Sequence, residues 1–587
     1  MKTNTNEERN IKGETTMTPN TTTETAMDTR QSTIPQHTKE VGMVRTGITR
    51  CVLMAAAVFA TSMAVSADPV ILVKASQTWS DTGGDDLAAL KRLASGIGWD
   101  FQPNGETDAK LKELGIKYIR CINVDPLPGR FDEAGAFIVE GDTSRLDAHL
   151  KSCRDVGASP HICFGMGVPK ELQIASDKVK KDMGVMGQQA GDYCYWNGDK
   201  AKLKAHAKAY FDYVLVKNKF PEARFEVGNE PDIDGQFPRN PGPKLAMGSA
   251  KLYEEYFGIY SLLAEAAAEF ERERNIKVRI GGPAASWAFT FRFGGLNWAD
   301  RFIRDCAAQK TKIDFIGLHY YGNISSLDGE YKGSYPHFTE MLKRTRGSRD
   351  TFLPGVPLIF TEWGPSYVTD NTAKAAVNAD HVGAAWAAEF LRQMLVNGVE
   401  SSLYLVTTDQ PAQPGGEFKS IRGWPSLFVT PCAFGKPYPK PMYHVFKMLS
   451  QLEGARVEST RYGSIGSFVA AQGERRVVRA LIWNYAAIIP EGAASVETAS
   501  KEGVTLRVRD AGAFFKGAQK VKMSRWLLCK GSGDDSWRLE NNQLEPKDFR
   551  EDILVDNATL TVLDGELDCC FSMPPSSVSL VELSPAE

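Results

Sequence analysis

The sequence predicts an α/β protein in which a (β/α)8 TIM barrel is followed by a C-terminal β-sandwich. The first observation behind this prediction is that short apolar or β-branched runs alternate with long amphipathic segments between about residue 110 and Leu452, as in repeated βαβ units. The second is that short runs of alternating polarity follow Leu452, separated by Gly, Asn, Asp and Pro, as in a β-sandwich. A doubly wound open sheet is the alternative, and the lack of a Gly-rich phosphate turn after the early strands disfavours it.

Seven barrel strands are expected in the first part of the chain. In order, they are Tyr118–Val124, Pro160–Phe164, Arg224–Val227, Val278–Ile280, Phe315–His319, Leu358–Thr361 and Ser402–Val406. The helices between them include Ser144–Val156, Ala201–Asn218, Ala250–Asn275 and Ala373–Asn397, which have apolar residues at i, i+3 and i+4 spacing. A closed barrel needs one more strand, which we expect between Val70 and Phe101.

The second part of the chain is expected to contain a series of strands, and no segment in it has a convincing helical pattern. They are Ser464–Ala471, Val477–Asn484, Val504–Arg509, Ala558–Val562 and Ser577–Leu583. The chain therefore divides into a leader at 1–67, a catalytic barrel at 68–452 and a β-sandwich accessory domain at 453–587. We expect the accessory domain to pack against the barrel rather than to bind glycan.

Composition excludes several classes of protein. The 587 residues carry 69 Lys and Arg against 72 Asp and Glu, a net charge of −3, so nucleic acid is not expected as a partner. Hydrophobic residues make up 42% and charged residues 24%, which is typical of a globular protein and not of one with many membrane spans. The ten cysteines include no CxxC pair and no Cys/His cluster at zinc spacing, so we expect no metal site.

The leader at 1–67 contains the pattern of a secretory signal, which follows a polar segment at 1–42. An apolar run at 51–65 follows a positively charged segment and ends in the small residues of a cleavage site, so we expect cleavage after Ala67. This predicts a secreted or periplasmic protein with no stable membrane association after cleavage, and an uncleaved membrane anchor is the alternative. Because a conventional signal would start at Met43, the true start is either Met1 or Met43.

Two glutamates follow predicted strands at the end where barrel enzymes carry out catalysis. Glu230 lies in FEVGNEPD and Glu362 lies in LIFTEWGPS. They are 362 − 230 = 132 residues apart, or three βα units, so they are expected at the ends of the fourth and seventh strands, facing one another across the barrel. A lone glutamate at a strand end is commonly half of a salt bridge, but two facing carboxyls suit a retaining glycosidase. Such an enzyme uses one carboxyl as nucleophile and the other, with a raised pKa, as acid.

Several segments, in order, resemble a known family. They are LGIKYIRCINV (114–124), HICFGMGVP (161–169), FEVGNEPD (225–232), VRIGGPAAS (278–286), DFIGLHYYG (314–322), FTEWGPS (360–366) and PPSSVSLVEL (574–583). Over most of the mature length the chain resembles glycoside hydrolase family 39, a clan A family of retaining enzymes that includes β-xylosidases and α-L-iduronidases. The resemblance implies that Glu230 is the acid/base and Glu362 the nucleophile.

The resemblance also implies residues that bind the sugar. Asn229 is placed to hydrogen-bond the substituent at sugar C2. His319 and Tyr320 are placed to orient the nucleophile and to donate to sugar hydroxyls. Trp363, and Trp287 after the fifth strand, offer flat apolar faces for a sugar ring.

Two departures from the family pattern concern the substrate pocket. The eighth-strand segment LYLVTTDQPAQPGG (403–416) has no Trp at the position where many relatives place a sugar platform. The insertion Lys170–Lys200 either walls the pocket and favours exo-action or is a surface excursion. The contribution of Tyr321 is left open.

The expected activity is hydrolysis of terminal glycosidic linkages of poly- or oligosaccharides by a two-glutamate double displacement. Carbohydrate is the expected partner, and no metal or other cofactor is required, because two carboxyls and a water suffice. Another clan A glycosidase, of arabinofuranosidase or glucuronidase type, is one alternative, and a non-catalytic carbohydrate-binding protein is another. A pure binder has no need for two facing carboxyls, which disfavours the second. The sugar, the linkage and the oligomeric state stay open.

Overall fold

The structure, a computed structural model, describes most of the chain from residue 69 onward. The described residues are 69–77, 86–99, 103–122, 124–174, 195–233, 237–240, 245–286, 292–293, 296–322, 325–327, 330–332, 338–368, 377–409, 423–429, 437–457, 463–485, 502–530 and 553–586. The predicted leader at 1–67, Trp287 and most of the 170–200 insertion lie outside them. Among the described helices, none is long and apolar enough to cross a membrane.

Eight strands form a closed parallel barrel, which confirms the predicted fold class. In chain order they are β2 (Gly96–Gly98), β3 (Tyr118–Cys121), β6 (Ser159–Phe164), β7 (Arg224–Val227), β8 (Arg279–Ala285), β11 (Phe315–Tyr321), β14 (Leu358–Gly364) and β15 (Ser401–Tyr404). The strand that the sequence did not locate is β2, within the expected window of 70–101. Each strand pairs with its neighbours in the chain, and β15 pairs with β2 to close the ring.

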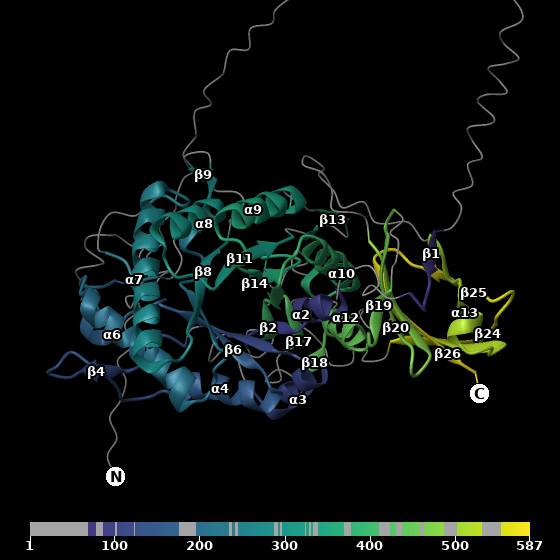
Figure 1. Cartoon of the computed structure of the whole chain (residues 1–587), viewed down its shortest axis with the longest axis horizontal. Coiled ribbons are helices and arrows are strands. Elements are labelled where there is room, and N and C mark those ends of the chain that lie inside the picture. The colour runs from purple at the N-terminus through teal and green to yellow at the C-terminus, as the bar shows by residue number, and fades with distance from the viewer. Residues whose placement is uncertain are drawn as a thin grey trace, which may run out of the picture. The chain divides into compact units, whose positions relative to one another are not determined.

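Helices surround the barrel strands, as Figure 1 shows for α7, α8 and α9. The helices are α2 (Asp86–Leu93), α3 (Gly105–Glu113), α4 (Ser144–Val156), α6 (Lys200–Phe211), α7 (Ala250–Arg274), α8 (Trp298–Gln309), α9 (Phe338–Phe352), α10 (His381–Val396) and α12 (Pro441–Ser450). Helix α10 begins later than the predicted Ala373, because the side chain of Asp380 caps it by accepting from the N–H groups of Val382 and Gly383. Helix α6 continues into a π-helical turn at Asp212–Lys217.

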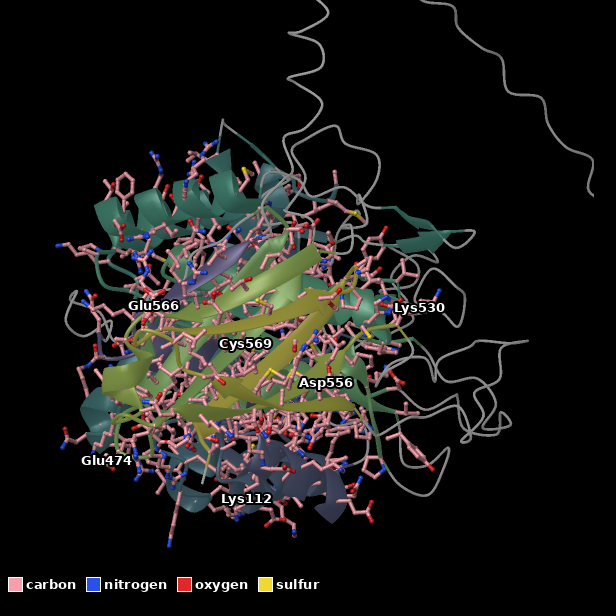
Figure 2. The ribbon with its side chains drawn as sticks, turned by 90° about the vertical axis from the view of Figure 1, so that its right-hand side faces the viewer. Lys112, Glu474, Lys530, Asp556, Glu566 and Cys569 are labelled. Carbon is pink, nitrogen blue, oxygen red and sulfur yellow. The ribbon has the colours of Figure 1, made fainter. Side chains whose placement is uncertain are left out.

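The C-terminal domain consists of two sheets with a hydrophobic core between them. The larger sheet contains, in spatial order, β19 (Ala455–Val457), β20 (Ile465–Gln472), β21 (Val477–Asn484), β26 (Ser577–Pro585), β23 (Lys520–Leu528) and β24 (Leu554–Thr561). The smaller sheet contains β1 (Val70–Val73), β22 (Glu502–Val508) and β25 (Leu567–Met573). Figure 2 looks onto these strands, with Asp556 of β24 and Cys569 of β25 labelled. The Cys569 side chain is buried in the core between the sheets.

Strand β1 corrects the predicted start of the barrel at residue 68. Its four residues pair in parallel with β22, more than 400 positions along the chain, and Figure 1 shows it in purple among the yellow-green strands. The side chains of Ile71 and Val73 are buried in the core of the C-terminal domain. After the strand, Asp510 accepts from the N–H groups of Ala75 and Ser76, both at 2.7 Å. The described chain thus begins in the β domain and enters the barrel only afterwards.

The β domain packs against the barrel through α10, the helix that follows the seventh barrel strand. Trp483 of β21 belongs to the same buried cluster as Trp386 and Phe390 of α10. Its indole Nε1 donates to Oε2 of Glu389 at 3.1 Å, and both side chains are buried. This contact agrees with the expectation that the domain packs on the barrel.

Candidate active site

The inward-facing residues of β11 form one wall of the site. Side chains alternate along a strand, so Gly317, His319 and Tyr321 face one side of the barrel wall while Leu318 and Tyr320 face the other. His319 and Tyr321 both contact carboxylates at the carboxyl end of the barrel. This is the end at which barrel enzymes carry out catalysis.

Glu362 reaches the same space because β14 is irregular beside it. The ladders that join β14 to β11 and β15 both shift register between Phe360 and Trp363. Two successive residues, Thr361 and Glu362, therefore face inward between two outward-facing aromatic residues. Irregularities of this kind commonly re-aim a side chain next to an active site.

Glu230 lies beyond the end of β7 in a constrained turn. Its backbone has a φ of 49°, a left-handed conformation that costs a residue other than glycine about 1 kcal/mol. The Glu230 N–H donates to the carbonyl of Ala284 in β8 at 3.0 Å, and the Gly228 N–H donates to the carbonyl of Phe164 at 2.7 Å. These bonds to both neighbouring strands hold the turn, and with it the direction of the Glu230 side chain.

The guanidinium of Arg120, in β3, joins the two halves of the site. Its Nη1 donates to Oε2 of Glu362 at 2.6 Å, and its Nη2 donates to Oδ1 of Asn229 at 2.9 Å. Its Nε donates to Oε2 of Glu226, a fully buried residue of β7, at 3.1 Å. Arg120 is itself fully buried. A single planar donor group thus fixes residues from the fourth and seventh strands relative to one another.

Arg120 also determines which nitrogen of His319 carries the proton. Nη2 of Arg120 lies 3.3 Å from Nε2 of His319, and because a guanidinium can only donate, Nε2 must accept. The proton of the neutral ring is then on Nδ1, which donates to Oε1 of Glu230 at 3.2 Å. Burial lowers the pKa of His319, in agreement with a neutral ring.

The two glutamates have different surroundings. Burial raises the pKa of Glu230 to about 7, although the charge of Arg120 opposes the shift. Glu362 instead accepts hydrogen bonds from Arg120 and from the hydroxyl of Tyr321, which is how an ionised carboxylate is bound. Burial and the negative charges of Glu362 and Glu230 raise the pKa of Tyr321, so its hydroxyl stays protonated as a donor.

The two carboxyl groups and the His319 ring are close together. One carboxylate oxygen each from Glu230 and Glu362 and a ring nitrogen of His319 lie within 4.8 Å of one another. These three are the described residues best placed to surround a metal ion, but the Arg120 charge, 2.6 Å from Glu362, opposes a second cation there. The separation fits a retaining carboxyl pair, at about 5–5.5 Å, and not an inverting pair, at about 6.5–9.5 Å.

Tyr320 and Trp363 do not line the site, contrary to the prediction. The Tyr320 ring stacks on Phe390 of α10 with centroids 5.3 Å apart. Trp363 is fully buried and packs on Trp386 and Phe390 of the same helix and on Tyr404. Each follows an inward-facing residue, so strand alternation turns it toward the helix layer.

Four of the predicted site residues are brought together, namely Glu230, Glu362, Asn229 and His319. Trp287 lies outside the described residues.

Three further residues complete the site without having been assigned from the sequence. They are Arg120, Glu226 and Tyr321. Arg120 and Glu226 did leave a signal. Arg120 is the one charge in the strand YIRC, and Glu226 lies between Phe225 and Val227 in the buried part of RFEV, after Arg224 at the start of the strand. Two such charges in one buried barrel interior are expected to pair, since an unpaired buried charge is strongly unfavourable.

An apolar wall lies at the same end of the barrel, beside the first, third and eighth strands. Trp99, Met166 and Leu405 follow those strands, are buried, and form one cluster with Trp424. The rings of Trp99 and Trp424 meet edge to face with centroids 6.2 Å apart. Trp424 therefore brings an indole close to the end of the eighth strand, where the segment 403–416 contains no tryptophan. Aromatic surface of this kind suits the C–H face of a sugar.

A closed (β/α)8 barrel with two glutamates at the ends of its fourth and seventh strands defines the class of this protein as a glycoside hydrolase. The model of the glycosyl hydrolases family 39 matches residues 72–537, and the chain belongs to this family.

Individual relatives agree with this assignment. The chain is 23% identical to a β-xylosidase of Caldicellulosiruptor saccharolyticus over 379 residues, which are 62% of this chain and 68% of the relative. The crystal structure of the GH39 enzyme from Xanthomonas axonopodis pv. citri is similar with a TM-score of 0.65 and 19% identity, over 90% of this chain and 100% of that one. A monomeric β-xylosidase from Caulobacter crescentus CB15 gives a TM-score of 0.61 at 20% identity, over 88% and 100%.

Proposed function

We propose that this glycosidase retains the anomeric configuration, with Glu362 as nucleophile and Glu230 as acid and then base. The observation that carries the proposal is the pair of carboxyls with oxygens within 4.8 Å, one at a pKa of about 7 and the other held by Arg120 and Tyr321. Two neighbouring carboxyls with such different surroundings support the assignment of one as acid and the other as nucleophile.

In the first step, an oxygen of Glu362 attacks the anomeric carbon of the sugar while the bond to the leaving oxygen breaks. Glu230 transfers its proton to that oxygen, so the alcohol leaves neutral and Glu230 becomes a carboxylate. Since His319 donates to Oε1 of Glu230, the transferable proton is on Oε2. In the second step, Glu230 takes a proton from water, whose oxygen attacks the same carbon and releases Glu362.

Asn229 supports the first step through its fixed orientation. Its Oδ1 accepts from Arg120, so the amide nitrogen, a donor, is turned to the other side of the group. A donor in this position would hydrogen-bond the 2-hydroxyl of the sugar, a contact that strengthens in an oxocarbenium-like transition state.

We propose a terminal sugar of a poly- or oligosaccharide as the substrate, and β-xylosides as the first compounds to assay. The support for β-xylosides is that two of the relatives are named β-xylosidases. A panel of aryl glycosides that also includes arabinofuranosides and glucuronides separates this activity from the other clan A types. Binding without turnover across the whole panel would indicate a carbohydrate-binding protein.

The stereochemical outcome tests the mechanism. With an aryl β-xyloside, or the panel glycoside cleaved best, we expect the first-formed sugar to have the configuration of the substrate. Proton NMR of the anomeric signal during the first minutes, before mutarotation, is the measurement. An inverted first product would contradict the proposal, since it requires a single displacement by water.

The pH dependence should reflect Glu230. The acid must be protonated to assist departure of the leaving group, and its pKa is about 7. Activity on substrates with poor leaving groups should therefore fall as the pH rises through about 7, with half of the plateau kcat/KM lost near that pH. Initial rates between pH 5 and 9 provide the check, and a plateau that extends to pH 9 would argue against Glu230 as the acid.

We further propose that the protein is secreted or periplasmic and is cleaved after Ala67. The support is the pattern of a charged segment, an apolar run at 51–65 and a small-residue cleavage site. N-terminal sequencing of protein recovered outside the cytoplasm tests this, and a mature N-terminus upstream of 51–65 would contradict it.

A further inference from the structure

Glu226 is a buried carboxylate that the proposed mechanism does not use. It lies in β7, four residues before Glu230, and its side chain has no exposed surface. Its Oε2 accepts from Nε of Arg120 at 3.1 Å. The other partners of that guanidinium include Glu362 and Asn229, which are placed to meet the sugar, whereas Glu226 lies too deep in the barrel to do so. Glu226 can therefore act on the reaction only through Arg120.

The surroundings of Glu226 leave Arg120 as its principal counter-charge. The groups that face it are Arg120 from β3, His161 and Cys163 from β6, and His319 from β11. His161 Nε2 lies 3.5 Å from Oε2, but burial lowers the pKa of this histidine, so it is neutral near pH 7. Burial alone would raise the pKa of Glu226, yet the charge of Arg120 and the contact with His161 hold it well below its usual range. The contact with Arg120 therefore favours the ionised form of Glu226.

The second oxygen of Glu226 is fitted against β11. A Cβ atom added to Gly317 would lie 2.3 Å from Oε1 of Glu226 and 3.4 Å from a methyl carbon of Thr361. Glycine at position 317 thus leaves the space that the carboxylate occupies. Two neighbours therefore fix the position of the Glu226 carboxylate. Arg120 in β3 donates a hydrogen bond to it, and Gly317 in β11 leaves room for it.

We infer that Glu226 is a positioning residue, which orients the Arg120 guanidinium so that its remaining donors meet Glu362 and Asn229. Without Glu226, the charge of Arg120 would be balanced by Glu362 alone. The guanidinium would then bind the nucleophile more tightly and lose the contact that fixes its plane. This inference rests on the proposed function, because its effect is measured on the cleavage of a glycoside.

Glu226→Gln is the principal test, because it keeps the size of the side chain and removes the charge. We expect kcat to fall about a hundredfold, the size of effect that a misplacement of about 1 Å produces. Arg120, which already lowers the pKa of Glu230, would lose the carboxylate that balances its charge, so the alkaline limb of the kcat/KM profile should also move to lower pH. A loss of charge pairing that only weakened the fold would not move this limb. Wild-type kcat, or a lower kcat with an unmoved limb, would overturn the inference.

Asp409→Asn is the matched control. Asp409 forms another fully buried ion pair, with Lys440 Nζ at 2.6 Å, away from Arg120. The Asp409→Asn substitution should lower the melting temperature and leave the pH profile of kcat/KM unchanged. If the profile moved as it does in Glu226→Gln, the shift would reflect loss of any buried pair, and the inference would be wrong.

Gly317→Ala provides a second test if Glu226→Gln does not fold. The added methyl displaces the carboxylate from Arg120 but keeps its charge. We expect kcat and kcat/KM to fall together, as when a contact made in the transition state is lost. Unchanged kcat would overturn the inference. Failure of the proposed function, in contrast, would appear in the wild-type enzyme, as no turnover or an inverted product.

Discussion

Replacing Glu362 by alanine should reduce turnover of every cleavable glycoside by about 10⁴-fold or more, because none of the other described residues is placed to form the covalent bond to the sugar. Arg120 keeps Glu226 as a counter-charge in this variant, so the fold should survive. The space left by the carboxylate is open to a small anion. Azide should therefore restore turnover of a substrate with a good leaving group and yield a glycosyl azide of inverted configuration, which NMR identifies.

Glu389→Ala is the control for this experiment. Glu389 is a glutamate on α10 that is as buried as Glu362 but contacts Trp483 of the β domain instead of the site. Its removal should cost stability and leave kcat per folded molecule within a few-fold of the wild type. If Glu362→Ala kept wild-type rates on the glycosides that the enzyme cleaves, Glu362 would not be the nucleophile.

The positions of the two glutamates in the barrel could be predicted because they depend on counting. Each βα unit has similar length, so the number of units between Glu230 and Glu362 gives their strands, the fourth and the seventh. The carboxyl end of every barrel strand opens on the same face. No side-chain contact is needed for either step, and the sequence suffices for both.

The directions of the aromatic residues beside them could not be predicted in the same way. Whether Tyr320 or Tyr321 faces inward depends on which set of alternating residues of β11 points into the barrel. Gly317, which faces Glu226 of another strand, shows that the odd-numbered residues do. Trp363 faces outward because β14 shifts register next to Glu362. Such an irregularity arises from the pairing of three strands and has no marker within LIFTEWG.

The local sequence of β1 also does not show that this strand belongs to the C-terminal domain. Val70–Val73 has four apolar residues that suit a barrel strand and an edge strand equally. Its partner, β22, is distant in the sequence, and only the tertiary fold brings the two together. Arg120 and Glu226 illustrate the opposite case, in which each residue is conspicuous alone but its meaning depends on the other.

Replacing Glu230 by alanine should give a loss that depends on the leaving group. A glycoside with a poor leaving group needs the proton from Glu230 and should be cleaved about 10²–10⁴-fold more slowly, the usual contribution of general acid catalysis. A dinitrophenyl glycoside releases dinitrophenolate, which leaves without protonation. The first step with this substrate should therefore keep nearly the wild-type rate. The fall in activity near pH 7 should disappear, since the group with that pKa is gone. Rates against leaving-group pKa, measured at several pH values, provide the check.

The two alanine variants are controls for one another, because azide enters from opposite faces of the sugar. In Glu230→Ala the covalent intermediate on Glu362 still forms but lacks a base to activate water, so it should accumulate after a burst of released phenol. Azide needs no base and attacks from the side of the departed aglycone, giving a glycosyl azide of retained configuration. Glu362→Ala gives the inverted azide from the same substrate. The roles assigned to the two carboxyls would be wrong if both variants gave the same anomer. They would also be wrong if Glu230→Ala cleaved substrates with good and with poor leaving groups more slowly by the same factor.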